Sequence, residues 1–216
     1  MSHSNTIFIC GALRSGSSLT HLILDHHPNI TNPGEFDFLF DHAFDYGTFP
    51  PVQYYQDKLS VNRVFQSKKL SIDSSLTYSQ LIESFISQLT KPSCLLALNI
   101  HRNFNRIPYL FPNAKFIHLI RDPRDVARSS IGMGWAGNVY YGIDHWIETE
   151  KSWQRLQAKL SPEQYIEIRF EKLILSPESE LQKICDFLGV TYSDSMLNYA
   201  DNSTYSAPDP SLVYQW

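Results

Sequence analysis

The sequence has few cysteines, no long apolar run and no surplus of positive charge. Cys10, Cys94 and Cys185 lie far apart without zinc-binding spacing, so we interpret them as buried free thiols rather than as a metal site or a disulfide framework. No apolar run reaches the roughly 18 residues of a transmembrane helix. Residues 1–5 lack the basic segment of a signal peptide. The default expectation is therefore a cytoplasmic protein without a membrane span.

The chain has 216 residues, a net charge of −4, 43% hydrophobic and 19% charged residues. This length suits one α/β domain, and two complete domains would be crowded. We therefore predict a single domain over residues 1–216. The slightly acidic balance argues against nucleic-acid binding and against a polybasic membrane surface. A bound anion must be held by a few placed donors. The oligomeric state is not predicted.

Apolar runs and amphipathic stretches alternate along the chain. Strands are expected at residues 6–10, 93–100, 114–120 and 165–170, and helices at residues 17–26, 78–89, 122–131, 143–160 and 177–188. This alternation predicts an α/β fold with a central, mostly parallel sheet flanked by helices on both faces. Residues 33–60 carry many aromatics, several Asp and a Pro-Pro break. We predict a long irregular or partly helical insertion there.

The segment Gly11–Ser18 joins the first strand to the first helix. It matches a Walker A loop except that Ser17 stands where the lysine belongs. Gly11 and Gly16 let the backbone approach an anion closely. The amides of residues 15–18 are expected to form an anion-binding nest at the helix N-terminus. Arg14 adds a permanent charge, and hydroxyls come from Ser15, Ser17 and Ser18. The alternative is an ordinary strand–helix turn with Arg14 as a surface charge.

The missing lysine bears on the reaction class. ATP-dependent phosphoryl transfer uses that lysine on the β- and γ-phosphates together with Mg²⁺. A phosphosulfate presents less charge at the group that is transferred. An arginine, hydroxyls and backbone amides suffice for it in principle, so no metal site is predicted.

A second motif, RDPRDVARSS, follows the strand at residues 114–120. Its Arg121 lies at the carboxyl end of that strand, where ligands bind in open α/β sheets. Ser129 follows eight residues later on the next helix and is expected to share an anion with Arg121. Arg124 and Arg128 are either phosphate contacts or solvated helix charges, the latter being more common.

Three segments in this order resemble the PAPS-dependent sulfotransferase family, in its bacterial and Golgi-like branch (PAPS is 3′-phosphoadenosine 5′-phosphosulfate). They are FICGALRSGSSLTHLILDHHP, FPNAKFIHLIRDPRDVARSS and YIEIRFEKLILSPESELQKICDFLGV. The resemblance implies a P-loop-NTPase-like sulfotransferase fold that transfers a sulfuryl group from PAPS to a hydroxyl. It assigns residues 14–18 to the 5′-phosphosulfate, and Arg121 and Ser129 to the 3′-phosphate. Phe170 matches a position near the adenine, with core packing as the alternative.

Glu35 is the leading candidate for the general base that removes the acceptor proton. It follows a Pro-Gly turn, at a place where branches of the resembled family carry a catalytic glutamate. Phe36 and Phe38 are expected to desolvate it and raise its pKa, and a surface loop glutamate is the alternative. His101, at the end of the second predicted strand, is the second candidate. Many relatives have Lys-x-Pro near residues 99–104, and this chain has none, so His101 or Arg102 is considered as a substitute for that lysine. The alternative for His101 is a hydrogen-bonded structural histidine.

The resemblance also implies a C-terminal region that helps to cover the nucleotide. The chain stops at Trp216, so either it is truncated relative to the family or the cover comes from elsewhere. The acceptor stays open among a small molecule such as a phenol, a saccharide, a lipid and a peptide tyrosine. The aromatic residues 36–55 suit a ring-bearing acceptor, or they simply pack as a lid.

Other functions remain possible from the sequence. A P-loop kinase for a small metabolite would need Mg²⁺, and Asp122 would act as its Walker B acid. A sulfotransferase-like domain that binds nucleotide without catalysis is the other alternative.

Overall fold

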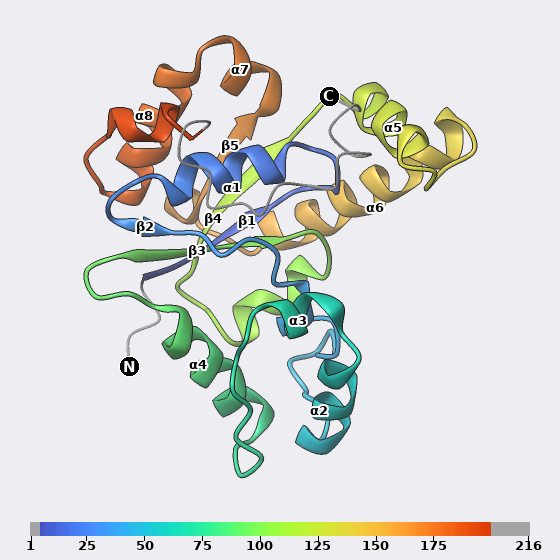
Figure 1. The fold of residues 1–216 in the computed structure, drawn as a ribbon. Coiled ribbons are helices and arrows are strands. Elements are labelled where there is room, and N and C mark those ends of the chain that lie inside the picture. Colours follow the sequence, from blue (N-terminus) through green and yellow to red (C-terminus); the bar gives the residue numbers. More distant parts are fainter. Residues whose placement is uncertain (1–4, 200–216) are drawn as a thin grey trace.

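Five short strands form the centre of the structure, a computed structural model that describes residues 5–199 (Figure 1). They are β1 (Thr6–Cys10), β2 (Ile30–Thr31), β3 (Leu95–Ile100), β4 (Lys115–Ile120) and β5 (Tyr165–Arg169). Their order across the sheet is β2-β3-β1-β4-β5, and every pair is parallel. The carboxyl ends of β1, β3 and β4 therefore meet at one edge, and the predicted α/β class is confirmed.

Helices cover both faces of the sheet (Figure 1). They are α1 (Ser17–Asp25), α2 (Val52–Ser60), α3 (Arg63–Ser67), α4 (Tyr78–Leu89), α5 (Pro123–Gly132), α6 (Val139–Gln157), α7 (Phe170–Leu175) and α8 (Pro177–Leu188), with 3-10 helices η2 (Asp37–Leu39) and η3 (Phe104–Tyr109). Side chains alternate between the faces of a strand. Phe8 and Cys10 of β1 accordingly belong to one core, with residues of α2, α4 and α6. Ile7 and Ile9 belong to the other, with residues of α1 and α8.

The aromatic insertion is largely a core. Phe36, Phe38, Phe40 and Tyr55 are fully buried, and the Tyr55 hydroxyl donates to the Phe38 carbonyl at 3.0 Å. These rings stabilise α2, α3 and α4 against the sheet through apolar burial and ring contacts. The lid-packing interpretation is thus confirmed for them, and they are closed to an acceptor. The sequence did not predict α3 or the two-residue strand β2.

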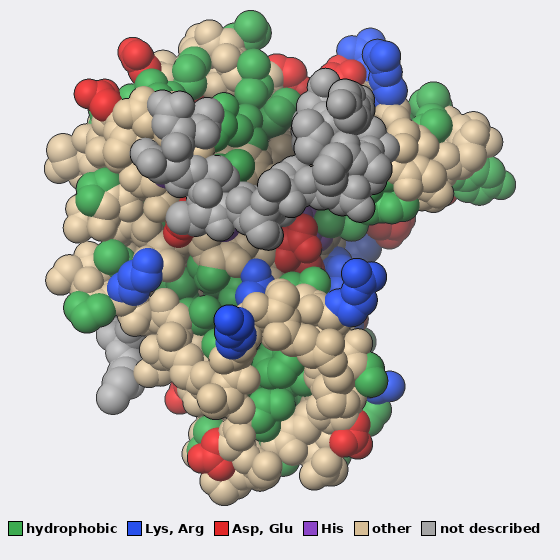
Figure 2. Space-filling model, in the orientation of Figure 1, with side chains coloured by type: hydrophobic (Ala, Val, Ile, Leu, Met, Phe, Trp, Pro, Cys, Tyr) green, Lys and Arg blue, Asp and Glu red, His purple; other side chains and the backbone are tan. Residues whose placement is uncertain are grey.

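Within residues 5–199, no helix combines the length and apolarity needed to cross a bilayer. On the face drawn in Figure 2, lysine and arginine side chains are dispersed over the surface. The C-terminal segment from residue 200, on which the prediction of a truncated nucleotide cover falls, lies outside the described residues.

Candidate active site

The loop between β1 and α1 has the backbone of an anion-binding site. Arg14 and Gly16 adopt left-handed conformations, with φ of 73° and 94°, and such residues turn neighbouring N–H groups toward one concave side. The first backbone hydrogen bond of α1 runs from the Thr20 amide to the Gly16 carbonyl. The amides of the preceding residues therefore have no acceptor within the helix and point out of its N-terminus. One expectation is wrong: the Ser15 amide donates to the Ala12 carbonyl at 3.1 Å, which leaves residues 16–18 as the amide donors.

Residues far apart in the sequence meet at this loop. The Arg14 Nε donates to the Ser129 Oγ of α5 at 2.7 Å, and an Arg121 guanidinium nitrogen donates to the Arg14 carbonyl at 3.0 Å. Burial, and then the neighbouring Arg121 cation, lower the pKa of Arg14. Two guanidinium groups held this close repel each other, and an anion between them removes that repulsion. The structure thus brings together the residues of both predicted phosphate motifs.

Two polar atoms at the loop show that the residues present fit such an anion. The Ser15 Oγ and the Arg121 Nε are buried and have no hydrogen-bond partner among the described residues. Buried donors without a partner are uncommon in folded proteins, because each costs about 1–3 kcal/mol. Phosphate or sulfate oxygens would satisfy both donors.

Phe170 lies at the same site, as the first residue of α7 rather than as the last residue of a strand. The Arg121 guanidinium carbon is 4.5 Å from the centre of its ring. A Cβ added to Gly16 would lie 2.1 Å from a carbon of that ring. Phe170 therefore supports Arg121 and the anion loop by packing, and its proximity to an adenine stays a prediction.

We expect Gly16→Ala to destabilise the fold by about 2–4 kcal/mol, because it adds a clash with Phe170 to an unfavourable positive φ. Urea unfolding of the purified protein would measure this loss. The double variant Gly16→Ala/Phe170→Ala relieves the clash alone, so the two effects should be non-additive. Additive losses would show that the two residues do not contact each other.

The remaining polar residues of the second motif face solvent or cap the helix. Arg124 is 83% exposed and pairs with Asp122, so it is a solvated helix charge, and Arg128 is exposed as well. The Asp122 carboxylate caps α5 by accepting the Arg124 amide, and the Arg124 side chain lowers the pKa of Asp122 to about 2. Asp122 therefore serves as a helix cap, which weakens the Walker B interpretation.

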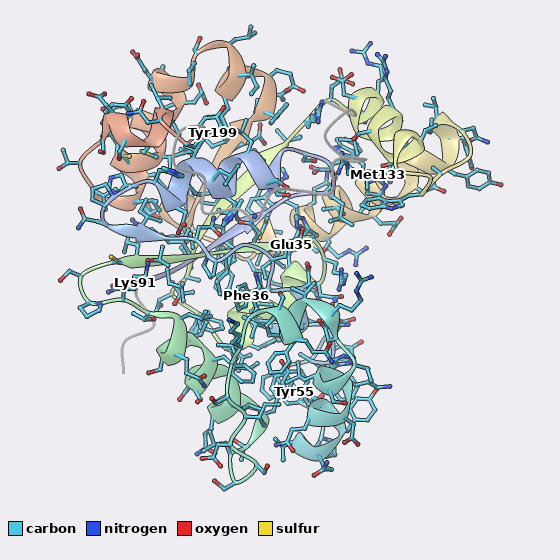
Figure 3. The ribbon with its side chains drawn as sticks, in the orientation of Figure 1. Glu35, Phe36, Tyr55, Lys91, Met133 and Tyr199 are labelled. Carbon is cyan, nitrogen blue, oxygen red and sulfur yellow. The ribbon has the colours of Figure 1, made fainter. Side chains whose placement is uncertain are left out.

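Glu35 and His101, the alternative bases of the sequence analysis, lie side by side. Glu35 follows β2 and forms a bridge with Asn99 of β3, while His101 follows β3 directly. The His101 Nε2 is 3.6 Å from a Glu35 carboxylate oxygen. The His101 Nδ1 lies 2.9 Å from the Gly11 carbonyl, which can only accept, so Nδ1 carries a proton and Nε2 faces Glu35. Figure 3 shows Glu35 near the centre of the molecule, at the sheet.

The pair favours its ionised forms. The expected raised pKa of Glu35 is wrong: His101 outweighs burial, which does raise it, and the pKa is lowered. Burial by itself lowers the pKa of His101, but Glu35, Asp37 and the Gly11 carbonyl outweigh it, and the net pKa is raised. Glu35 is thus a carboxylate at neutral pH, and it is half exposed, with 46% of its side-chain surface accessible. It can accept a proton from a substrate.

A cavity opens on each side of this pair. One, of about 360 Å³, is lined by His101, Leu13 of the loop and polar residues of η3 and α6. The other, of about 210 Å³, runs from Ser18 past Glu35 to Lys68. Arg102 is unsuited to replace the missing lysine, because it makes a bidentate ion pair with Asp41 at 2.7 and 2.6 Å.

Sequence reasoning missed Lys68 and a buried amide pair. The Asn32 side chain donates to that of Asn99 at 3.2 Å, and Asn99 donates to the Ser17 carbonyl. This network ties the segment before Glu35 to the anion loop. No local pattern marks these residues, because only the adjacency of β2, β3 and β1 brings them together. Within residues 5–199, no group of three or more His, Cys, Asp or Glu has the arrangement of a metal site.

Comparison with known proteins adds a family to this geometry. A family model described as "Sulfotransferase family" matches residues 6–194. A putative protein-tyrosine sulfotransferase of Caenorhabditis briggsae is 30% identical over 208 residues, which is 89% of this chain and 68% of the relative. Protein-tyrosine sulfotransferase 2 of Gallus gallus is 24% identical, over 90% of this chain and 54% of its own length.

Solved structures share the fold. The sulfotransferase domain of the Synechococcus PCC 7002 olefin synthase superposes with a TM-score of 0.75 and 21% identity, and covers 99% of this chain and 84% of its own. A mouse sulfotransferase complexed with PAP (adenosine 3′,5′-bisphosphate) gives a TM-score of 0.56 at 17% identity, covering 98% and 74% of the two chains. Some curated relatives are longer, and the chain spans about half of the Gallus gallus protein.

Proposed function

The chain belongs to the sulfotransferase family, and from this premise we propose that it transfers a sulfuryl group from PAPS to a hydroxyl, with Glu35 as the general base. The observation that carries the proposal is the convergence of Arg14, Ser129 and Arg121 beside the partnerless donors of Ser15 and Arg121. Such a set of donors, without the Walker lysine, fits a nucleotide that carries a phosphosulfate and a second phosphate.

Bound PAPS would supply the sulfuryl group and a phosphate leaving group. Arg14, Ser15 and the amides of residues 16–18 would hold the phosphosulfate and stabilise the charge that develops on the leaving oxygen. Arg121 and Ser129 would hold the 3′-phosphate. Glu35 would take the proton of the acceptor hydroxyl as the acceptor oxygen bonds to sulfur. His101 would keep Glu35 ionised and oriented.

The kinase alternative has less support. Ser17 cannot supply the cation that a P-loop lysine places on the β- and γ-phosphates, and Asp122 is engaged as a helix cap. A domain that binds nucleotide without catalysis remains the second alternative, and turnover distinguishes it. The acceptor is proposed only as a hydroxyl: relatives are named for protein tyrosine and for an omega-hydroxy-dihydromenaquinone.

We expect PAP at 100 times its dissociation constant to raise the melting temperature by roughly 5–11 °C, since binding adds about 2.7 kcal/mol. ADP, which lacks the 3′-phosphate, should give a small shift. Differential scanning fluorimetry of the purified chain measures both.

Arg121→Ala should abolish the PAP shift, whereas Arg124→Ala, a matched arginine of the same motif that faces solvent, should retain it. A shift confined to ATP with Mg²⁺ would contradict the proposal and support a kinase. A PAP shift without turnover of any acceptor in a broad panel would support a binding domain.

A further inference from the structure

The smaller cavity beside Glu35 is lined in part by a glycine. Gly34 has a φ of 89°, and a Cβ built on it would lie 3.5 Å from the Lys68 Nζ and 4.0 Å from the His21 Cε1. The missing side chain thus leaves space between an ammonium group and an imidazole. Glu35 follows directly, and Ser18 of the anion loop lines the same cavity. The space therefore connects the proposed phosphosulfate site to Lys68.

Lys68 is held in this cavity. Its Nζ donates to the Pro33 carbonyl at 2.5 Å and lies 4.9 Å from the centre of the Phe36 ring. An ammonium group has three N–H donors, and the Pro33 carbonyl takes one of them. Burial lowers the pKa of Lys68, while Glu35 raises it. The cation is thus fixed in place by the turn that presents the proposed base.

The charges around the cavity differ from those of the larger one. There Arg102 and Arg106 are paired with Asp41 and Asp45, and the lining also carries Glu148 and Arg155. Here, among the residues that the structure describes, Glu35 is the only carboxylate in the lining, and it is proposed to face the acceptor hydroxyl. His21 is uncharged at neutral pH, because burial lowers its pKa. The charge of Lys68 is therefore available to a ligand.

We infer that this cavity binds a carboxylate of the acceptor through Lys68, so that the acceptor is a small hydroxy acid whose hydroxyl lies at Glu35. The inference rests on the proposed function and names its substrate class. The volume of about 210 Å³ suits a small acid. The acceptor carboxylate also raises the proton affinity of nearby Glu35, because like charges disfavour ionisation, and this improves Glu35 as a base.

The test uses the protein saturated with PAP and two matched pairs of ligands: 4-hydroxyphenylacetate with its amide, and 3-hydroxybutyrate with its amide. Isothermal titration calorimetry gives the affinities. In at least one pair the acid should bind about tenfold or more tightly than the amide. This affinity ratio corresponds to the free energy of one hydrogen bond between charged groups. Lys68→Met should bring this ratio to about one, and Lys68→Arg should keep most of it.

Lys91→Met is the matched control, since Lys91 is exposed and lies away from Glu35 at the turn between α4 and β3 (Figure 3). It should leave the acid preference intact. A PAP-bound protein that prefers neither acid would overturn the inference and leave the proposed function standing. A preference that persists in Lys68→Met would overturn it as well. Failure of PAP itself to bind would instead contradict the proposed function.

Discussion

Glu35→Gln is expected to lower kcat for sulfuryl transfer by about 10²–10⁴-fold, the usual contribution of a positioned general base. Glutamine keeps the size of the side chain and cannot accept the acceptor proton. The residues that hold PAPS are left unchanged, so the PAP-induced melting shift should equal that of the wild type. Steady-state kinetics with PAPS and an accepted hydroxyl compound, together with the melting assay, separate the two effects.

The pH profile shows whether Glu35 and His101 act as the pair that the structure contains. Activity should rise with pH through the lowered pKa of Glu35 and fall again through the raised pKa of His101. Stability follows the same signs: the Glu35 contribution is lost as pH falls through its folded-state pKa, and that of His101 is lost as pH rises through its own. Glu35→Gln should remove the acid limb.

Two further variants identify the base. Glu178→Gln changes an exposed glutamate of α8 and should leave kcat unchanged. His101→Gln should cost less than Glu35→Gln, because His101 acts through Glu35. If His101→Gln abolishes turnover while Glu35→Gln retains most of it, the roles are reversed and His101 is the base.

The sequence was sufficient for the elements with strong local patterns. The strands β1, β3 and β4 are apolar runs, and β5 alternates apolar and charged residues; such patterns are recognisable one strand at a time. The two residues of β2 are too few to show a period. The aromatic insertion is rich in rings whichever way it folds, so its partition into buried core and exposed rim depends on contacts with the sheet.

The candidate site likewise contains residues that the sequence predicts and residues that only the tertiary structure brings together. The anion loop and Arg121 directly follow strands, and they were predicted from their motifs, from that position and from the family resemblance. The pairing of Glu35 with His101 depends on β2 lying beside β3, and strand order is a tertiary property. Lys68 directly follows the five-residue helix α3, beyond the aromatic insertion, and only the packing of this segment on the turn at Gly34 brings its charge to the site. The sequence analysis treated Glu35 and His101 as alternative bases, and the fold places their side chains next to each other.

Arg14→Ala is expected to lower kcat by about 10²–10³-fold, as the loss of a donor aimed at developing charge does in other enzymes. Arg14 is the one side chain of the loop that carries a charge, and the bond from its Nε to the Ser129 Oγ aligns the guanidinium group. Arg14→Lys should recover only part of the rate, because an ammonium lacks the planar fork of donors.

Ser129→Ala tests whether this alignment matters. It should lower kcat less than Arg14→Ala does, and the losses of the two single variants should combine to less than their product in the double variant, because the hydroxyl acts partly through the arginine. Arg128→Ala, a neighbouring exposed arginine on α5, controls for the loss of charge near the site. Equal losses from Arg14→Ala and Arg128→Ala would mean that general charge near the site, rather than the placement of one guanidinium group, supports the reaction. Independent, multiplicative losses from Arg14→Ala and Ser129→Ala would mean that the two residues hold different parts of the nucleotide without acting on each other.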